Sequence, residues 1–277
     1  MEILEIIKEG LIFPSQNLEK LAIYIVLTFV MGLLFVGGLI SGVFAAVDNS
    51  IFFIITAILS IIAICLAFIV SGYQIGIIKT GIDFADEAPS FDWKNDLITG
   101  IKALIVSIVY FIIPAIIIAI VALVTNIPGQ IMDITQQAAL SPANATAVAS
   151  STTPIATISD AAAMGLFTSI AITGVIALVL IIIFAFIATM ANARLANTGS
   201  LADAVNVVES FKDITRIGAG KVIAVILLVI IVVAVIQGIL GYLYGQIPQL
   251  SIISIIVTPY FTFFTNRVTG LLYSDIA

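Results

Sequence analysis

The chain has 277 residues, of which 62% are hydrophobic and 9% are charged, and its mean hydropathy is +1.29. Soluble globular domains are about half apolar and about a quarter charged, so this composition excludes a soluble protein and requires lipid as part of the solvent. The net charge of −6 comes from acidic residues that share the polar segments with the basic ones, which excludes a nucleic-acid-binding patch.

Few residues are available for catalysis or metal binding. The chain has no histidine, the commonest general base near neutral pH and a frequent metal ligand. Its single cysteine, Cys65, lies in an apolar run and cannot form a disulfide within the chain. We therefore predict no catalytic residues, no metal site, no cofactor, and a protein that is not an enzyme.

Six stretches are long and apolar enough to cross a bilayer, whose hydrocarbon core of about 30 Å needs about 20 helical residues. The predicted spans are residues 21–47, 51–78, 103–124, 166–191, 222–242 and 250–265. Only Asp48-Asn49-Ser50 separates the first two spans, which predicts a tight hairpin. The expected fold is an all-α integral membrane bundle of about six transmembrane helices, forming a single domain over residues 1–277.

The basic residues all fall on one side of this predicted bundle. They are Lys8, Lys20, Lys79, Lys94, Lys102, Arg194, Lys212, Arg216, Lys221 and Arg267. The opposite loops, residues 48–50, 125–165 and 244–249, contain none. Because Lys and Arg in short loops mark the cytoplasmic side, we predict a multi-pass protein of the cell membrane with both termini cytoplasmic.

The longest predicted outer loop, residues 125–165, is rich in Ala, Ser and Thr and contains three prolines. We expect it to be loosely ordered. Asn144-Ala145-Thr146 matches the acceptor pattern for N-glycosylation, which makes Asn144 a candidate glycosylation site. A chance tripeptide explains the same pattern, and both interpretations stay open.

The cytoplasmic segment 201–217 is predicted to form an amphipathic helix that lies in the membrane interface, with its apolar stripe against lipid or against the bundle. The stripe recurs at helical spacing and consists of Leu201, Val205, Val208 and Phe211. A shorter helix of the same kind is predicted at the N-terminus, ending at Gly10. Because each cytoplasmic segment that precedes a hairpin has a polar stretch, an aromatic residue and then a lysine, we interpret the chain as three units, each an interfacial element followed by two spans.

Two aromatic residues, Phe91 and Trp93, lie at the boundary before the third span. We interpret them as an interfacial anchor, since amphipathic rings favour the headgroup level; a partner-docking patch is the alternative. The surrounding acidic run, residues 83–96, is interpreted as a solvated loop because its spacing matches no metal-binding loop.

Three glycine pairs follow the spacing that lets helix backbones approach closely, and we expect contacts within the chain in preference to dimerisation. The pairs are Gly38 with Gly42, Gly72 with Gly76, and Gly241 with Gly245.

Two stretches resemble known membrane proteins. The first resembles the prokaryotic family DUF4013, whose function is unknown, at Gly72-Tyr73-Gln74, Asp86 through Trp93, Asp96-Leu97 and Gly100-Ile101-Lys102-Ala103-Leu104. Pro259 in the last span and Leu272-Tyr273-Ser274-Asp275 are similar to the membrane domain of glycerophosphodiester phosphodiesterases. The resemblance implies six spans and no known active site. The sequence contains no phosphodiesterase catalytic domain, so that activity is not expected.

The predicted spans carry no Asp, Glu, Lys or Arg at depth, which disfavours an ion-coupled transporter. The first hypothesis is a non-catalytic protein that organises membrane lipids or other membrane proteins through its interfacial elements. The alternative is a carrier or channel for a neutral or apolar solute, near the spans kinked by Pro114 and Pro259. Gln237 facing a water-filled cavity would favour the carrier, whereas Gln237 bonded to a neighbouring helix would favour the organiser.

We predict that Ser90 is cytoplasmic, because basic residues flank it in a short loop. A Ser90→Cys variant should be protected from a membrane-impermeant thiol reagent in intact cells and should react after the cells are opened. Free labelling in intact cells would reverse the topology.

Overall fold

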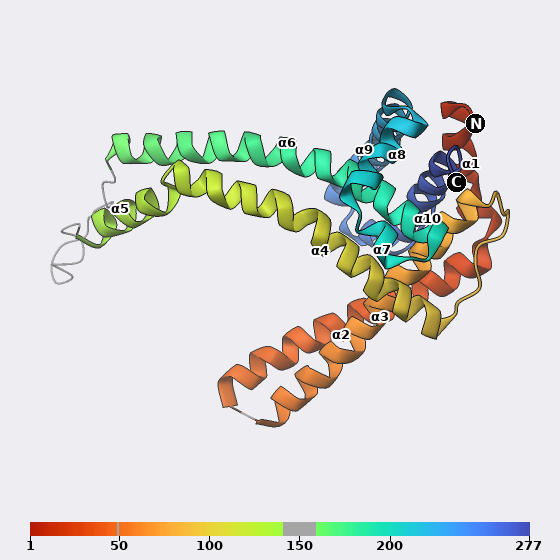
Figure 1. Ribbon diagram of the computed structural model, residues 1–277. Coiled ribbons are helices and arrows are strands. Elements are labelled where there is room, and N and C mark those ends of the chain that lie inside the picture. Colours follow the sequence, from red (N-terminus) through yellow and green to blue (C-terminus); the bar gives the residue numbers. More distant parts are fainter. Residues whose placement is uncertain (49, 141–158) are drawn as a thin grey trace. The chain divides into compact units, whose positions relative to one another are not determined.

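Every secondary-structure element is a helix in the described part of the computed structural model, which covers residues 1–48, 50–140 and 159–277 (Figure 1). The long helices are α2 (Leu18–Asp48), α3 (Ser50–Ile82), α4 (Trp93–Val124), α6 (Asp160–Thr198), α9 (Ala219–Gln246) and α10 (Ser254–Tyr273). The shorter elements are α1 (Ile3–Gln16), α5 (Ile127–Leu140), α7 (Leu201–Ala204), α8 (Val207–Ile217) and the 3-10 helix η2 (Pro248–Ile253).

The six predicted spans are confirmed, although the helices extend beyond the predicted limits. The largest difference is at α6, predicted over 166–191 and observed over Asp160–Thr198, because Ala, Leu and Arg at its ends are strong helix formers. Within the chain, only 11–22% of the most apolar window of each span is buried, so most of the apolar surface is available to lipid. The chain is therefore a multi-pass membrane protein.

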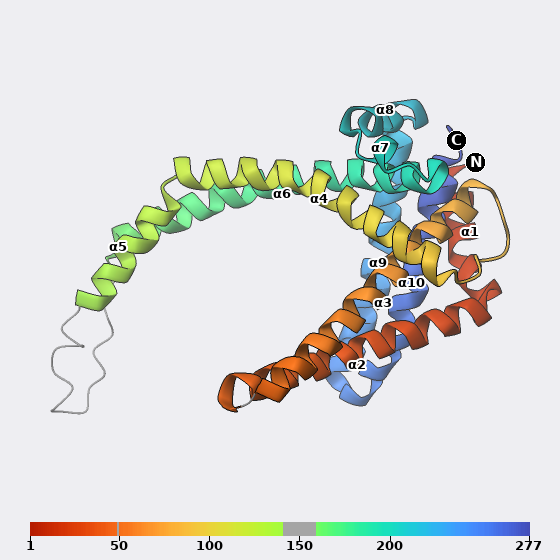
Figure 2. The same cartoon turned by 60° about the horizontal axis from the view of Figure 1, so that its bottom comes forward.

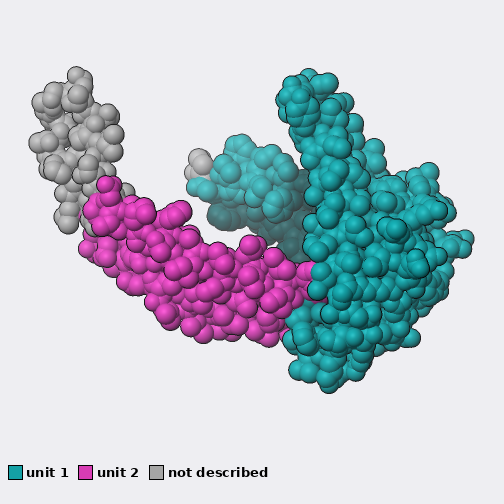
Figure 3. All heavy atoms as spheres, turned by 90° about the horizontal axis from the view of Figure 1, so that it is seen from above, with its two compact units in different colours: residues 1–108, 187–277 teal, residues 109–186 magenta. Residues whose placement is uncertain are grey.

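The chain forms two compact units, coloured separately in Figure 3. Unit 1 comprises residues 1–108 and 187–277, and unit 2 comprises residues 109–186. Helices α4 and α6 each contribute residues to both units.

Glycines bring α3 and α10 into backbone contact in unit 1 and let α1 lie close to α10. A Cβ atom at Gly270 of α10 would overlap the carbonyl oxygen of Ile78 in α3, and one at Gly81 of α3 would lie 2.9 Å from the Cα atom of Gly270. On the other side of α10, Gly10 of α1 approaches the side chain of Val268 closely. Lipid does not drive helices together, so these close contacts matter because they let dispersion forces act between the helices.

An aromatic cluster lies beside these contacts. Tyr73 of α3 is stacked on Phe91 with 3.8 Å between ring centroids, and Phe263 of α10 lies edge-on to Tyr24 of α2 at 5.4 Å. Phe13 of α1 also packs on Phe263, and every member except Phe91 is buried. Aromatic pairs contribute about 0.5–1.5 kcal/mol beyond their buried area, so this cluster joins α1, α2, α3 and α10.

The predicted end of the N-terminal helix is wrong. Helix α1 passes through Gly10 and continues to Gln16, because Gly10 provides the close approach to α10 and does not terminate the helix. Its buried face includes Ile6, Ile7 and Phe13, at the spacing of one helical face. This stripe packs on the bundle, which was one of the two arrangements expected for an interfacial helix.

Two of the three glycine pairs make the predicted contacts within the chain: Gly38 with Gly42, and Gly72 with Gly76. Gly72 lies against the backbone of Asp96 in α4, and Gly100 of α4 lies reciprocally against the backbone of Phe68 in α3. The third pair is different, because no described atom outside the local helix lies within 4 Å of a Cβ built at Gly241 or Gly245.

Polar contacts join the segments of unit 1 that carry basic residues, and we call this region the basic end. The contacts are Glu9 with Arg267, Asn17 with Asp86 and Ala88, Lys102 with Gly199, Arg194 with Asp213, and Lys221 with Asp275. Segments far apart in the sequence therefore meet at one end of unit 1, as expected if they lie on the same side of a membrane.

Unit 2 corrects the expectation of a loosely ordered segment 125–165. Helix α5 begins at Ile127, and Pro128 occupies its first turn, where a proline costs no hydrogen bond. Gln130 donates to the Ser169 hydroxyl of α6 at 2.9 Å, and Ser169 donates to the Thr125 carbonyl at 3.1 Å. Both ends of the predicted loop are therefore part of the fold, and residues 141–158 lie outside the described residues.

The helix predicted over 201–217 is two helices. Helix α7 ends at Ala204, and α8 begins at Val207 after a new N-cap at Asn206, whose side-chain oxygen accepts from the Glu209 amide at 3.1 Å. The periodicity of the apolar residues concealed this break, because Asn206 suits both the polar face of a helix and an N-cap.

The threefold pattern agrees with the structure in its first and third units. Helix α1 precedes the α2–α3 hairpin, and α7 and α8 precede α9 and α10. The second pair, α4 and α6, instead follows a segment, residues 83–92, that is not helical.

Substitution of Gly270 tests the backbone contact between α3 and α10. Gly270→Ala should lower the stability of the purified protein by about 1–3 kcal/mol, because the new methyl group would meet the Ile78 carbonyl. Gly241→Ala, which adds the same methyl group in open space, should leave thermal unfolding in detergent unchanged or slightly raised. Equal effects of the two variants would contradict the proposed contact.

Candidate functional site

The predicted anchor residues have different environments. Phe91 is partly buried and stacks on Tyr73, whereas Trp93, the first residue of α4, is 52% exposed. The two rings remain neighbours at 6.4 Å between centroids. Phe91 is therefore part of the aromatic cluster, and the interfacial role of the pair stays a prediction. The other candidate residue, Asn144, lies outside the described residues.

The acidic residues of segment 83–96 are used locally. Asp92 caps α4 by accepting from the Asn95 amide at 3.1 Å, and Asp96 accepts from the Asp92 amide at 3.0 Å. Asp83 pairs with Lys79 at 3.7 Å. Among the described residues, no group of three or more His, Cys, Asp or Glu side chains is arranged to hold a metal ion.

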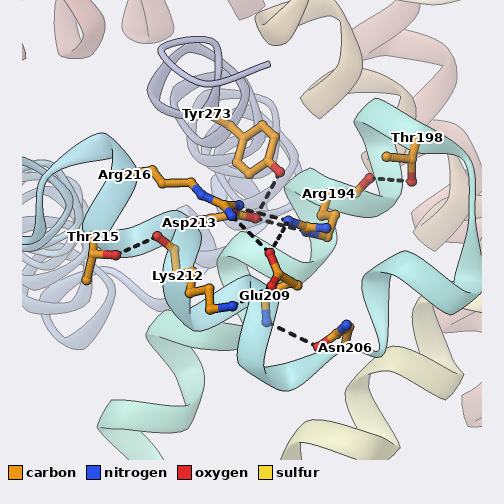
Figure 4. A network of polar contacts seen from close by, with 9 residues as sticks. All are labelled: Arg194, Thr198, Asn206, Glu209, Lys212, Asp213, Thr215, Arg216 and Tyr273. Atoms are coloured by element: carbon orange, nitrogen blue, oxygen red, sulfur yellow. Dashed lines mark hydrogen bonds and ion pairs between the residues drawn. The ribbon is translucent and has the colours of Figure 1, made fainter.

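A buried carboxylate, Asp213 of α8, is the centre of a polar network at the basic end (Figure 4). Arg194 of α6 contacts it twice, from Nε to Oδ2 at 2.9 Å and from Nη2 to Oδ1 at 3.1 Å. Arg216 of α8 donates to Oδ1 at 2.9 Å, and the Tyr273 hydroxyl of α10 donates to Oδ2 at 3.0 Å. We call these four residues the Asp213 clamp; it holds α8 against the ends of α6 and α10.

A second carboxylate, Glu209, lies on the outer side of the Asp213 clamp. It accepts from Lys212 at 2.7 Å and from Arg216 at 3.0 Å. Hydrogen bonds from Lys212 and Arg216 lower the pKa of the Glu209 carboxyl. Hydrogen bonds to Asp213 and Glu209 raise the pKa of Arg216. Both groups are therefore charged near neutral pH, although their exposure means that salt screens the attraction.

The number of bonds at Asp213 indicates what the clamp does. An ionised carboxylate offers about four acceptor positions, and four donors occupy them here. Asp213 could accept a substrate proton or a metal ion only by losing one of these bonds. The arrangement is suited to positioning α8, and it leaves no free base at this point.

The burial of Asp213 fixes the orientation of α8. Ser210 and Asp213 are buried, whereas Val208 is 63% exposed and Phe211 is 52% exposed. The apolar stripe predicted for this segment therefore faces away from the bundle on α8.

A second buried charge, Arg267, lies inside α10 and not after the sixth span as predicted. Its Nη1 donates to the carbonyl oxygens of Thr80 and Ala85 at 2.6 and 2.7 Å, and its Nη2 pairs with Glu9. The guanidinium carbon lies 4.5 Å from the ring centroid of Phe13. Arg267 thus joins α1, the end of α3 and α10, and it is the counterpart of the Asp213 clamp.

Sequence reasoning missed both buried charges, because it placed Arg194 and Arg267 outside the spans and Asp213 in an interfacial helix, with no partner assigned to any of them. The available signal was Arg194, which lies three residues after the predicted span 166–191, where the apolar helix continues. A charge on such a helix requires a partner, and Asp213 is on the next amphipathic segment.

We predict that Asp213→Asn weakens the attachment of α8, because the amide cannot match the charge of Arg194 and Arg216. The expected cost is about 3 kcal/mol, measured as earlier thermal unfolding and faster tryptic cleavage after Lys212 and Arg216. Tyr273→Phe, which removes one donor, should cost about 1 kcal/mol. Asp203→Asn on the exposed side of α7 is the matched control. A neutral result for Asp213→Asn would show that the clamp does not hold α8.

Comparison with known proteins places the chain in a family. The family model described as "Protein of unknown function (DUF4013)" matches residues 55–245, more than half of the chain. No curated protein and no solved structure matches. The matched region ends before Pro259 and residues 272–275, so the similarity to the membrane domain of glycerophosphodiester phosphodiesterases is not confirmed. The chain belongs to the DUF4013 family of proteins of unknown function.

Proposed function

We propose that this multi-pass membrane protein is non-catalytic and organises the lipids beside its basic end, with α8 as the element that contacts them. The observation that carries the proposal is the orientation of α8. Its central carboxylate is clamped to two spans, while its apolar residues Val208 and Phe211 face outward.

The surface of α8 divides into three edges. Asp213 and Ser210 contact the bundle, Val208 and Phe211 form an exposed apolar edge, and the basic side chain of Lys212 is 52% exposed beside them. A helix with one apolar and one basic edge lies in the boundary between headgroups and acyl chains, where both edges are solvated favourably. The Asp213 clamp then sets which side of α8 faces that boundary.

The position of α8 in the chain supports lipid as the occupant of its apolar edge. Helix α8 ends at Ile217 and the spanning helix α9 begins at Ala219, so α8 lies close to the boundary that α9 enters. Figure 2 shows α8 lying at the end where α9 begins. Ile223, near the start of α9, is also 46% exposed. If these side chains faced water, each Å² of exposed apolar area would cost about 25 cal/mol of free energy.

The same placement supports the proposed topology, with both termini cytoplasmic in the cell membrane. All basic segments gather at one end of unit 1, and the cytoplasmic leaflet is the one that carries anionic lipid. The Lys212 side chain, which is 52% exposed and pairs with Glu209, lies on the exposed side of α8 and can reach that headgroup layer.

The alternative of a carrier or channel is less supported. Gln237 is exposed on α9, and no described residue bonds to it. Gln237 therefore lacks the bond to a neighbouring helix that would favour the organiser, and the preference for the organiser rests on the orientation of α8.

We predict that α8 immobilises neighbouring phospholipids. In vesicles containing spin-labelled phosphatidylcholine and phosphatidylserine, the Val208→Ser/Phe211→Ser variant should show a smaller motionally restricted lipid fraction than the wild type. A second measurement places the helix: in a Cys65→Ser background, a nitroxide at Phe211→Cys should be relaxed more by oxygen than by a water-soluble nickel complex.

A nitroxide at Asp203→Cys, on α7, is the control and should favour the nickel complex. Equal lipid fractions for the wild type and the double variant would end the organiser proposal. Nickel access at residue 211 equal to that at residue 203 would show that the apolar edge does not meet lipid.

A further inference from the structure

A polar cavity of about 340 Å³ lies within unit 1, between α3, the first half of α4, α6 and α10. Its polar lining consists of two hydroxyl and three carboxamide side chains: Ser71, Gln74, Ser107, Asn192 and Asn266. The rest of the lining is apolar or glycine, so no charged side chain faces it. We propose that this cavity binds a small uncharged polyhydroxylated molecule.

The hydrogen bonds of these side chains argue against a purely structural role. Polar residues in membrane bundles commonly bond across to another helix, and Gln74 does so, donating to the Tyr24 hydroxyl of α2 at 2.7 Å. Ser107 and Asn266 instead donate to carbonyl oxygens of their own helices, those of Ala103 and Thr262. Cross-linking of helices therefore accounts for one of the five side chains.

One polar atom of the lining is a buried acceptor without a partner. The Oδ1 atom of Asn192 is buried and accepts no hydrogen bond in the described part of the chain. Among the same residues, no donor bonds to the carboxamide oxygens of Gln74 and Asn266. An unsatisfied buried oxygen such as that of Asn192 costs free energy in a low-dielectric setting unless a donor is supplied, and Gln74 and Asn266 add two more carboxamides to the same lining.

The lining also limits which class of ligand could donate hydrogen bonds to it. An ammonium or metal ion would enter without a compensating charge, which is unfavourable within a membrane bundle. A polyol offers several O–H donors to the carboxamide oxygens and can accept from the Ser71 hydroxyl at no cost in charge. A cavity of about 340 Å³ is at the small end of ligand sites, which fits a molecule between glycerol and a monosaccharide in size.

A second cavity, of about 350 Å³, adjoins the first along α3, α4 and α6 and shares Ile75 in its wall. It lies further toward the C-terminus of α6 and includes Lys79 and Lys102. The Lys102 ammonium donates to the Gly199 carbonyl at 2.8 Å. The polar lining of the second cavity therefore lies between the first cavity and the basic end, and a water-soluble ligand would arrive from the basic end.

The test is binding of glycerol, xylitol and glucose to the purified full-length protein in nanodiscs, measured by saturation-transfer NMR. At least one of these probes should bind, and Asn192→Leu, which keeps the side-chain size and removes the acceptor, should raise its Kd about tenfold or more. Gln237→Leu, a matched change on the exposed face of α9, should leave the Kd unchanged.

Ser71→Ala provides a second lining variant in case Asn192→Leu unfolds, and the melting temperature of each variant reports folding. If no saturation transfer to any of the three probes is seen, the cavity holds water alone and the proposal is overturned. Saturable binding of K⁺ or tetramethylammonium in place of the polyols would also overturn it. Because α8 contributes no residue to this cavity, failure here would not affect the lipid-organising proposal.

Discussion

Lipid removes the usual force that packs helices together, and the structure of unit 1 depends on that constraint. Acyl chains solvate Leu and Ile as well as another helix does, so apolar area alone cannot select one arrangement of the spans. The specific contacts must then come from close backbone approach and from polar bonds. Both are concentrated where Gly270 meets α3 and where Asp213 and Arg267 are buried.

The two clamps use this setting in different ways. Arg267 donates mainly to backbone carbonyl oxygens, so it ties its neighbours together with little dependence on their side chains. Asp213 accepts from three side chains on α6, α8 and α10, so it requires those residues at one place. Removing one partner of such a buried group leaves the other unpaired, which is why each clamp can hold a short element against long spans.

Much of the fold could be predicted from the sequence, because length and hydropathy limit what can cross a bilayer. The six spans and the contact role of Gly72 follow from such local rules. The path of α1 through Gly10 and the burial of Asp213 could not be predicted, since each depends on a partner far away in the sequence. The carboxamide cavity was missed for the same reason: Asn192 and Asn266 belong to different helices, and nothing local shows that they face one space.

The break between α7 and α8 follows from the geometry of burial. Ala204 is 0% exposed and Asp213 is 1% exposed, so other parts of the protein cover both. In one continuous helix these two residues, nine positions apart, would differ by about 900° of rotation and would lie on opposite faces, since each residue turns about 100°. One straight helix could not bury both against the same bundle. The new N-cap at Asn206 resets the rotation, so that Asp213 reaches Arg194 while Phe211 faces outward. The interruption that sequence periodicity concealed is thus what allows α8 to be clamped by its polar side and to present its apolar side to lipid.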